Sequence, residues 1–182
     1  VRIVAESSPK AFIFENVTGI TQKKHTAVAE YMKESLAKLD YSTSYCILNA
    51  ADYGVPQKRE RFFIIGIQGS FKPAFPIPTH FKNIEAYENF YEELGIKPLN
   101  EFKKWVSLGE AFEKLPRNYQ ERKDFAQMNI SDIVKDRMKL IGPNQNFNVL
   151  PDSMKPICWK SGKHQGHDTF GRLDINDVSV TV

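Results

Sequence analysis

The sequence predicts an α/β fold, and the prediction depends on a buried strand, a helix after it and two further strands. Residues 11–14 form a continuous apolar run, as in a strand buried on both faces of a sheet. Residues 24–39 then place Val28, Met32, Leu36 and Leu39 on one face of a helix. Segments 45–48 and 61–67 are the further strand candidates. Strand, helix and strand in this order predict an α/β sheet.

The second and third strands are joined by residues 49–60 alone, which show no helical pattern. Parallel strands need a longer crossover, so these two strands are predicted to be antiparallel neighbours.

The composition changes after residue 70, where residues 72–78 contain three prolines and are predicted to form an extended linker. Short helices are predicted beyond it, at 84–94, at 108–115 with Ser107 as its cap, and at 134–140. From Gly142 onward the chain is rich in Gly, Pro, Asn and Ser. We therefore expect one domain over residues 1–70 and a second region over residues 71–182.

Composition excludes some classes of protein. With 41% hydrophobic and 26% charged residues, the 182-residue chain is expected to be soluble and globular. Its longest apolar run, residues 62–65, is far short of the roughly 20 residues that a membrane span needs. A net charge of +3 is too mild to indicate nucleic acid by itself. Two cysteines favour a reducing compartment, and a start at Val1 suggests a cut or processed end.

Two motifs carry the candidate chemistry. Glu15, Asn16 and Val17 follow the first strand at its carboxyl end, where ligands bind in open α/β sheets. Taken alone, however, these three residues favour an ordinary strand-to-loop turn with a solvent-facing Glu15. Gln57, Arg59 and Arg61 are predicted to project to one side of the third strand. Paired guanidinium groups suit a phosphate or a base carbonyl, whereas the alternative is a charged strand end paired with surface acids.

Taken together, these motifs resemble the carbon-5 DNA cytosine methyltransferases. The resemblance consists of Phe-Glu-Asn-Val at 14–17 and Leu-Asn-Ala-Ala-Asp-Tyr-Gly-Val-Pro-Gln-Lys-Arg-Glu-Arg at 48–61. Ser-Leu-Gly-Glu-Ala at 107–111, two Leu-Pro pairs and Gly-Arg-Leu-Asp at 171–174 follow in the same order. The resemblance implies the C-terminal half of a Rossmann-like methyltransferase sheet with antiparallel last strands. A small irregular target-recognition domain would follow it.

The resemblance also implies a reaction, in which a target cytosine is flipped out of DNA and methylated at carbon 5 from S-adenosylmethionine. Glu15 would bind the edge of the cytosine, while Arg61 would hold the flipped nucleotide with support from Arg59. Asn16 and Gln57 would lie at the DNA-binding site. Both would have a structural role there, and Asn16 would hold its loop in shape.

The chain departs from the family pattern at the nucleophile. No Pro-Cys pair occurs, and neither Cys46 nor Cys158 is in a position to replace it. The glycine-rich cofactor motif and the final helix motif are also absent. We therefore expect no cofactor-binding residues and no methyl transfer by this chain alone. The missing N-terminal half or a partner subunit would supply both.

Residues 142–171 correspond to the family's base-reading loops, although a polar surface loop is an equal alternative. The predicted DNA contacts include Trp159 and His167 beside the cations and amides Lys155, Lys160, Lys163, His164, Gln165 and Arg172. Arg172 fits a purely structural role equally well. A zinc site at Cys158 and the two histidines lacks a fourth ligand and is not expected.

The implied partners are double-stranded DNA and a cognate restriction enzyme, in a bacterial or phage-derived cytoplasmic setting without a membrane. A DNA-binding module without chemistry and a degenerate prophage remnant remain the alternatives.

Overall fold

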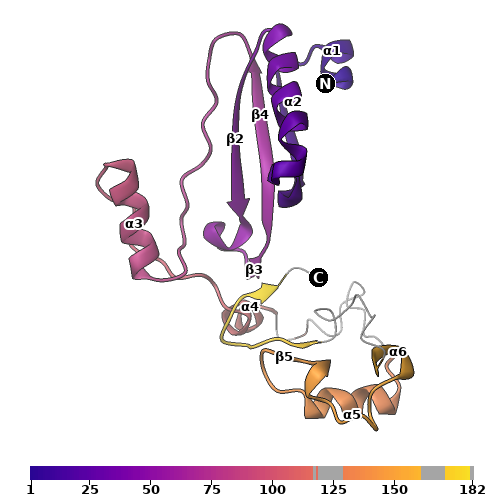
Figure 1. The fold of residues 1–182 in the computed structure, drawn as a ribbon. Coiled ribbons are helices and arrows are strands. Elements are labelled where there is room, and N and C mark those ends of the chain that lie inside the picture. Colours follow the sequence, from indigo (N-terminus) through magenta and orange to yellow (C-terminus); the bar gives the residue numbers. More distant parts are fainter. Residues whose placement is uncertain (117, 119–128, 161–170, 181–182) are drawn as a thin grey trace. The chain divides into compact units, whose positions relative to one another are not determined.

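The computed structural model describes residues 1–116, 118, 129–160 and 171–180 of the chain (Figure 1). The chain divides into two compact units, Val1–Trp105 and Val106–Val182. The division lies well after residue 70, because the segment that follows the sheet packs within the first unit. The assignment of residues 1–70 to catalysis and of 71–182 to recognition stays a prediction.

The first unit is built on a three-stranded sheet with the order β1 (Ala11–Val17), β4 (Glu60–Gln68), β2 (Tyr41–Asn49). The central strand β4 is antiparallel to both of its neighbours, which confirms the antiparallel pairing predicted for the second and third strands. Strands β1 and β2 consequently run parallel to each other, and α2 (Thr26–Lys38) connects them alongside the sheet (Figure 1). Two short 3-10 helices, η1 (Thr18–Thr21) and η2 (Lys23–His25), lead from β1 into α2.

Helix α2 covers one face of the sheet. Phe62 and Ile64 of β4 are buried on this face, and Leu36 of α2 is only 2% exposed. Burying a side chain of this size contributes about 1.5–3 kcal/mol. Leu36 confirms the predicted helix face, although Val28 at the beginning of α2 remains 48% exposed.

Strand β1 differs from the prediction. Its residues alternate between exposed and half-buried, and Ile13 is 72% exposed, so the expected burial on both faces is wrong. The reason is its position. Among the described residues β1 is hydrogen-bonded to one strand, β4, and helix α2 covers only one face of the sheet.

A glycine allows an aromatic ring to lie against the middle of the sheet. Phe12 pairs with Gly66 in the register of β1 and β4. A Cβ atom on Gly66 would lie 2.2 Å from a ring carbon of Phe12, so the ring occupies the space that a side chain would fill. The same ring meets Tyr41 of β2 edge-on, with the ring centroids 5.4 Å apart.

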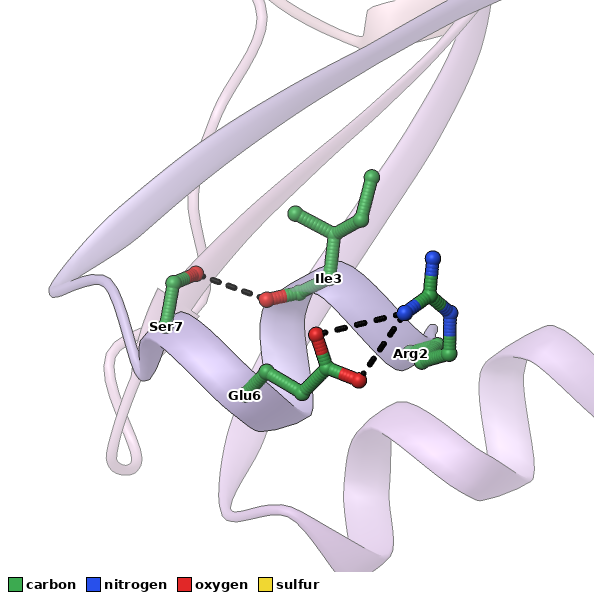
Figure 2. Close-up of polar contacts among 4 residues, drawn as sticks. All are labelled: Arg2, Ile3, Glu6 and Ser7. Atoms are coloured by element: carbon green, nitrogen blue, oxygen red, sulfur yellow. Dashed lines mark hydrogen bonds and ion pairs between the residues drawn. The ribbon is translucent and has the colours of Figure 1, made fainter.

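Helix α1 (Arg2–Ser7) precedes the sheet and is held by local contacts. Arg2 Nη1 lies 3.0 Å from Glu6 Oε1, and the Ser7 hydroxyl donates to the Ile3 carbonyl at 2.7 Å (Figure 2). The ion pair is exposed at both ends, so its contribution is at most about 1 kcal/mol.

The rest of the first unit is an extended segment followed by a helix. Residues 72–78 adopt no helix or strand, as the prolines predict, and α3 (Ile84–Leu94) begins and ends as predicted. Asn83 caps its first turn by accepting from the Ala86 N–H, and Gly95 ends it with a φ of 63°. The helix packs through a cluster of aromatic side chains, namely Phe81, Tyr87, Phe90, Tyr91 and Phe102.

The second unit contains short elements. The predicted helices near 108–115 and 134–140 are confirmed as α4 (Leu108–Glu113) and α5 (Asp132–Leu140). Ser107 and Glu110 form a reciprocal capping box at the start of α4. The other elements in the described part of this unit are β5 (Gln145–Asn146), η5 (Phe147–Val149), α6 (Ile157–Lys160), β6 (Gly171–Arg172) and β7 (Ser179–Val180).

The core of this unit consists of Ile141, Phe147 and Leu150, each 2% exposed. Met154 and Trp159 pack against these three side chains. In neither unit is any described helix long and apolar enough to cross a membrane.

Candidate functional site

The two motifs identified in the sequence meet at one end of the sheet. Arg61 Nε lies 3.0 Å from Glu15 Oε1, and the Arg61 side chain is 20% exposed against 47% for Glu15. Arg61 Nη1 also donates to the Glu60 carbonyl at 2.8 Å. These two contacts fix the guanidinium plane, whereas nearly half of the Glu15 side chain faces solvent.

Strand register brings Glu15 and Arg61 together. In the antiparallel pairing of β1 with β4, Arg61 is opposite Val17 and Phe63 is opposite Glu15. Residues two apart in a strand share a face, so Glu15 and Arg61 are diagonal neighbours on one face, within reach of long side chains. Asn16 projects to the other face, and its Oδ1 accepts from the Val17 N–H at 2.8 Å.

The loop before Arg61 is closed by the side chain of Asn49. Its Oδ1 accepts from the Arg59 N–H at 3.1 Å and from the Ala51 N–H at 3.3 Å. The Ala50 N–H donates to the Arg59 carbonyl at 3.0 Å. The loop consists of η3 (Ala50–Tyr53), Gly54 in the left-handed conformation with a φ of 82°, and the short strand β3 (Gln57–Lys58). Both backbone polar groups of Arg59 are therefore held.

The side chains of Gln57 and Arg59 differ in exposure. Gln57 is half-buried, whereas Arg59 is exposed and its guanidinium has no side-chain partner among the described residues. The carboxylate oxygens of Glu15, the guanidinium of Arg61 and the exposed guanidinium of Arg59 thus offer acceptors and donors to a polar ligand.

The predicted recognition residues are only partly within the described chain. Lys155 is 19% exposed and pairs with Asp152 at 3.2 Å, while Lys160 is exposed at the end of α6. Arg172 Nη1 lies 3.5 Å from the Ile141 carbonyl, and its backbone carbonyl accepts from the Asn144 N–H at 2.9 Å. Lys163, His164, Gln165 and His167 lie outside the described residues.

Trp159, which is also a predicted DNA contact, packs against the core of the second unit. Its ring packs against Phe147 with centroids 4.7 Å apart, and the Arg137 guanidinium lies 5.8 Å from its centre. These contacts bury part of the ring against the hydrophobic core of the second unit, and burial of a large aromatic side chain stabilises such a core.

Comparison with known proteins identifies the family. The family model described as C-5 cytosine-specific DNA methylase matches residues 1–167. This chain belongs to the C-5 cytosine-specific DNA methylases. The type II methyltransferase M.XorII of Xanthomonas oryzae pv. oryzae (strain KACC10331 / KXO85) is 46% identical over 198 residues, covering 100% of this chain and 44% of the relative. The type II methylase M.HgiEI of Herpetosiphon aurantiacus is 46% identical over 196 residues, covering 100% of this chain and 42% of the relative. The chain thus spans less than half the length of either relative.

A solved structure shows that the fold is shared. A protein described as a DNA modification methyltransferase encoded within a prophage of E. coli matches with a TM-score of 0.50 and 21% identity. The match covers 99% of this chain and 54% of that protein. The methylase chain therefore has a mixed α/β fold that includes an antiparallel sheet, as the sequence predicts.

Sequence reasoning missed two residues that support the arginine loop of this methylase chain. Trp105 Nε1 donates to Asp52 Oδ1 at 2.8 Å, and the Asp52 carbonyl accepts from the Thr79 and His80 N–H groups at 2.9 and 3.0 Å. Burial raises the pKa of the Asp52 carboxyl above its ordinary value of 3.8, while the hydrogen bond from Trp105 opposes the rise. In the sequence, the one signal for this contact is the polar residue Asp52 inside a segment that otherwise resembles a turn.

A cavity of about 380 Å³ lies between α2 and the sheet, away from the Glu15–Arg61 pair. Its floor includes Leu36, Phe62 and Ile64, and its polar lining includes Glu30 and Lys33. The lining described for this cavity includes no glycine-rich loop. Among the described residues, no group of three or more His, Cys, Asp or Glu side chains is placed to hold a metal ion.

Proposed function

We propose that this chain supplies the base-binding and DNA-recognition parts of a DNA (cytosine-5-)-methyltransferase. The complete enzyme flips a target cytosine out of double-stranded DNA and methylates carbon 5. The observation that carries the proposal is the Arg61–Glu15 ion pair of 3.0 Å, which unites two separate motifs in a member of the cytosine methylase family.

The chemistry of cytosine suits this pair. The base presents an exocyclic amine, a ring nitrogen and a carbonyl on one edge. A carboxyl group accepts from the amine and exchanges a proton with the ring nitrogen, whereas a guanidinium donates to the carbonyl. In the proposed reaction a cysteine thiolate adds to carbon 6, so charge develops at the ring nitrogen that faces Glu15. Preorganised groups at that edge stabilise the developing charge.

Arg59, Asn16, Gln57 and Arg172 have proposed roles in addition to this pair. Arg59 contacts the backbone of the flipped nucleotide, which its exposed guanidinium favours. Asn16 and Gln57 shape the two strand ends, and Asn16 does so through its contact with the Val17 N–H. Arg172 fixes the β5–β6 ribbon of the recognition region, a role that its pairing with Gln145 and its contact with the Ile141 carbonyl support.

The methyl donor is proposed to be S-adenosylmethionine, which supplies the methyl group when it is bound. Two observations support placing its site outside this chain: the sequence has no glycine-rich cofactor motif, and no such loop lines the described cavity beside α2. We therefore assign donor binding and the nucleophilic cysteine to an amino-terminal half or partner subunit. A cognate restriction enzyme and a prokaryotic or phage-derived cytoplasmic setting belong to the same proposal.

A mixing experiment tests this proposal. The 182-residue chain is assayed for transfer of a labelled methyl group from S-adenosylmethionine to unmethylated plasmid DNA, alone and with the amino-terminal part of M.XorII. We expect no transfer by either part and transfer by the mixture. Turnover by this chain alone would contradict the assignment. DNA binding without transfer by a stable mixture would favour the alternative, a DNA-binding module without chemistry.

A further inference from the structure

The Asn49 side chain makes a contact that secondary structure alone does not require. One of its two hydrogen bonds, from the Ala51 N–H, is the ordinary cap of the short helix η3. The other, from the Arg59 N–H at 3.1 Å, joins the two ends of the loop. A cap would be complete without this second bond.

The hydrogen bond from the Arg59 N–H to Asn49 restrains the backbone of the residues that are proposed to contact the ligand. Asn49 is the last residue of β2 and pairs with Glu60, while Leu48 pairs with Arg61. Asn49 and the Ala50 N–H together hold both backbone groups of Arg59, the residue immediately before β4. The backbone that carries Arg59 and Arg61 is therefore fixed on both sides, whereas the Arg59 guanidinium remains exposed.

Precise binding of a ligand requires that the groups around it be held in place beforehand, and the two backbone hydrogen bonds of Arg59 supply part of this restraint. We propose that Asn49 is a positioning residue for the target nucleotide. Its amide oxygen holds the backbone of Arg59 and so sets the direction in which Arg59 presents its guanidinium group, beside the guanidinium of Arg61. The inference rests on the proposed function, in which these arginines hold the flipped cytosine and its phosphate.

Two substitutions distinguish the role of the Asn49 amide oxygen from that of the rest of the side chain. The Asn49 Nδ2 group has no hydrogen-bond partner in the part of the chain that the structure describes. Asn49→Asp therefore retains both accepted hydrogen bonds, whereas Asn49→Leu has nearly the same size and accepts neither. In the assembled enzyme we expect Asn49→Leu to lower kcat/KM for unmethylated plasmid DNA by about three- to tenfold. Asn49→Asp is expected to remain within about twofold of the unsubstituted enzyme.

The KM for S-adenosylmethionine and the thermal midpoint are measured for both variants. A positioning role leaves the KM for the donor unchanged, while a purely structural role lowers the thermal midpoint and the active fraction in proportion. Equal losses in Asn49→Leu and Asn49→Asp would overturn the inference, because the acceptor oxygen would then be irrelevant.

A double-mutant cycle with Arg59→Ala identifies the route of the effect. If Asn49 acts through Arg59, Asn49→Leu lowers kcat/KM far less in the Arg59→Ala background than in the original enzyme. Full additivity would overturn the inference. Failure of the proposed function is a distinct outcome, since Arg59→Ala and Arg61→Ala would then both leave kcat/KM unchanged.

Discussion

Replacing Arg61 by alanine tests the arrangement at the end of the sheet. The guanidinium is fixed by Glu15 at 3.0 Å and by the Glu60 carbonyl at 2.8 Å, and its remaining N–H groups are left for a substrate carbonyl. A hydrogen bond to a charged group contributes about 1.5–3 kcal/mol. We therefore expect Arg61→Ala to lower kcat/KM for DNA in the assembled enzyme by about 10- to 150-fold.

The effect on folding is expected to be smaller. Glu15 is 47% exposed, so solvent screens the ion pair, and its loss costs at most about 1 kcal/mol of unfolding free energy. Steady-state kinetics on unmethylated DNA and urea unfolding of the same preparations measure the two effects.

Arg172→Ala is the matched control, since Arg172 makes one long side-chain contact of 3.5 Å and is not placed at the base. It removes the same positive charge. Equal losses of kcat/KM in the two variants would refute the reasoning, because both arginines would then merely neutralise phosphate.

Three further predictions concern other parts of the chain. Gly66→Ala should cost about 1–3 kcal/mol of unfolding free energy, because the new Cβ meets the Phe12 ring at 2.2 Å. Gly19→Ala, whose Cβ would lie 3.9 Å from Val17 Cγ2, should change this free energy by less than about 0.5 kcal/mol. Similar urea midpoints for both variants would contradict the clash at Gly66. Because the pKa of Asp52 is raised, its contribution to stability is greatest below its ordinary value of 3.8 and falls as the pH rises through the folded-state pKa. Asp52→Asn keeps an acceptor for Trp105, so the stability of this variant relative to the original chain should increase from about pH 4 to about pH 7. A difference in unfolding free energy that does not change with pH would argue against a desolvated charge at Asp52. Exchanging residues 152–170 for those of a relative with another target should move the methylated sites in sequencing, whereas unchanged sites would place specificity elsewhere, such as in residues 117–141.

Local sequence patterns predicted most of the elements. The four-four-three spacing of Val28, Met32, Leu36 and Leu39 identified α2, and the Ser107 cap identified α4, since both signals depend on residues within a few positions of each other. Burial was predicted less well. An apolar run indicates a strand that could be covered on both faces, but coverage depends on which other segments pack there. This is why Ile13 was expected to be buried and is 72% exposed.

The sequence by itself determined the family motifs, the alternation in the strands and the residue types available for chemistry. The tertiary structure decided which of these groups meet. Glu15 contacts Arg61 because β1 pairs with β4 in one register, and a shift by a single residue would turn Glu15 to the opposite face of the sheet. Asn49 holds Arg59, and Trp105 holds Asp52, because the chain folds back on itself there. Hydrophobic periodicity is a local property, whereas strand register and side-chain contacts across loops arise from the packing of segments that are distant in the sequence.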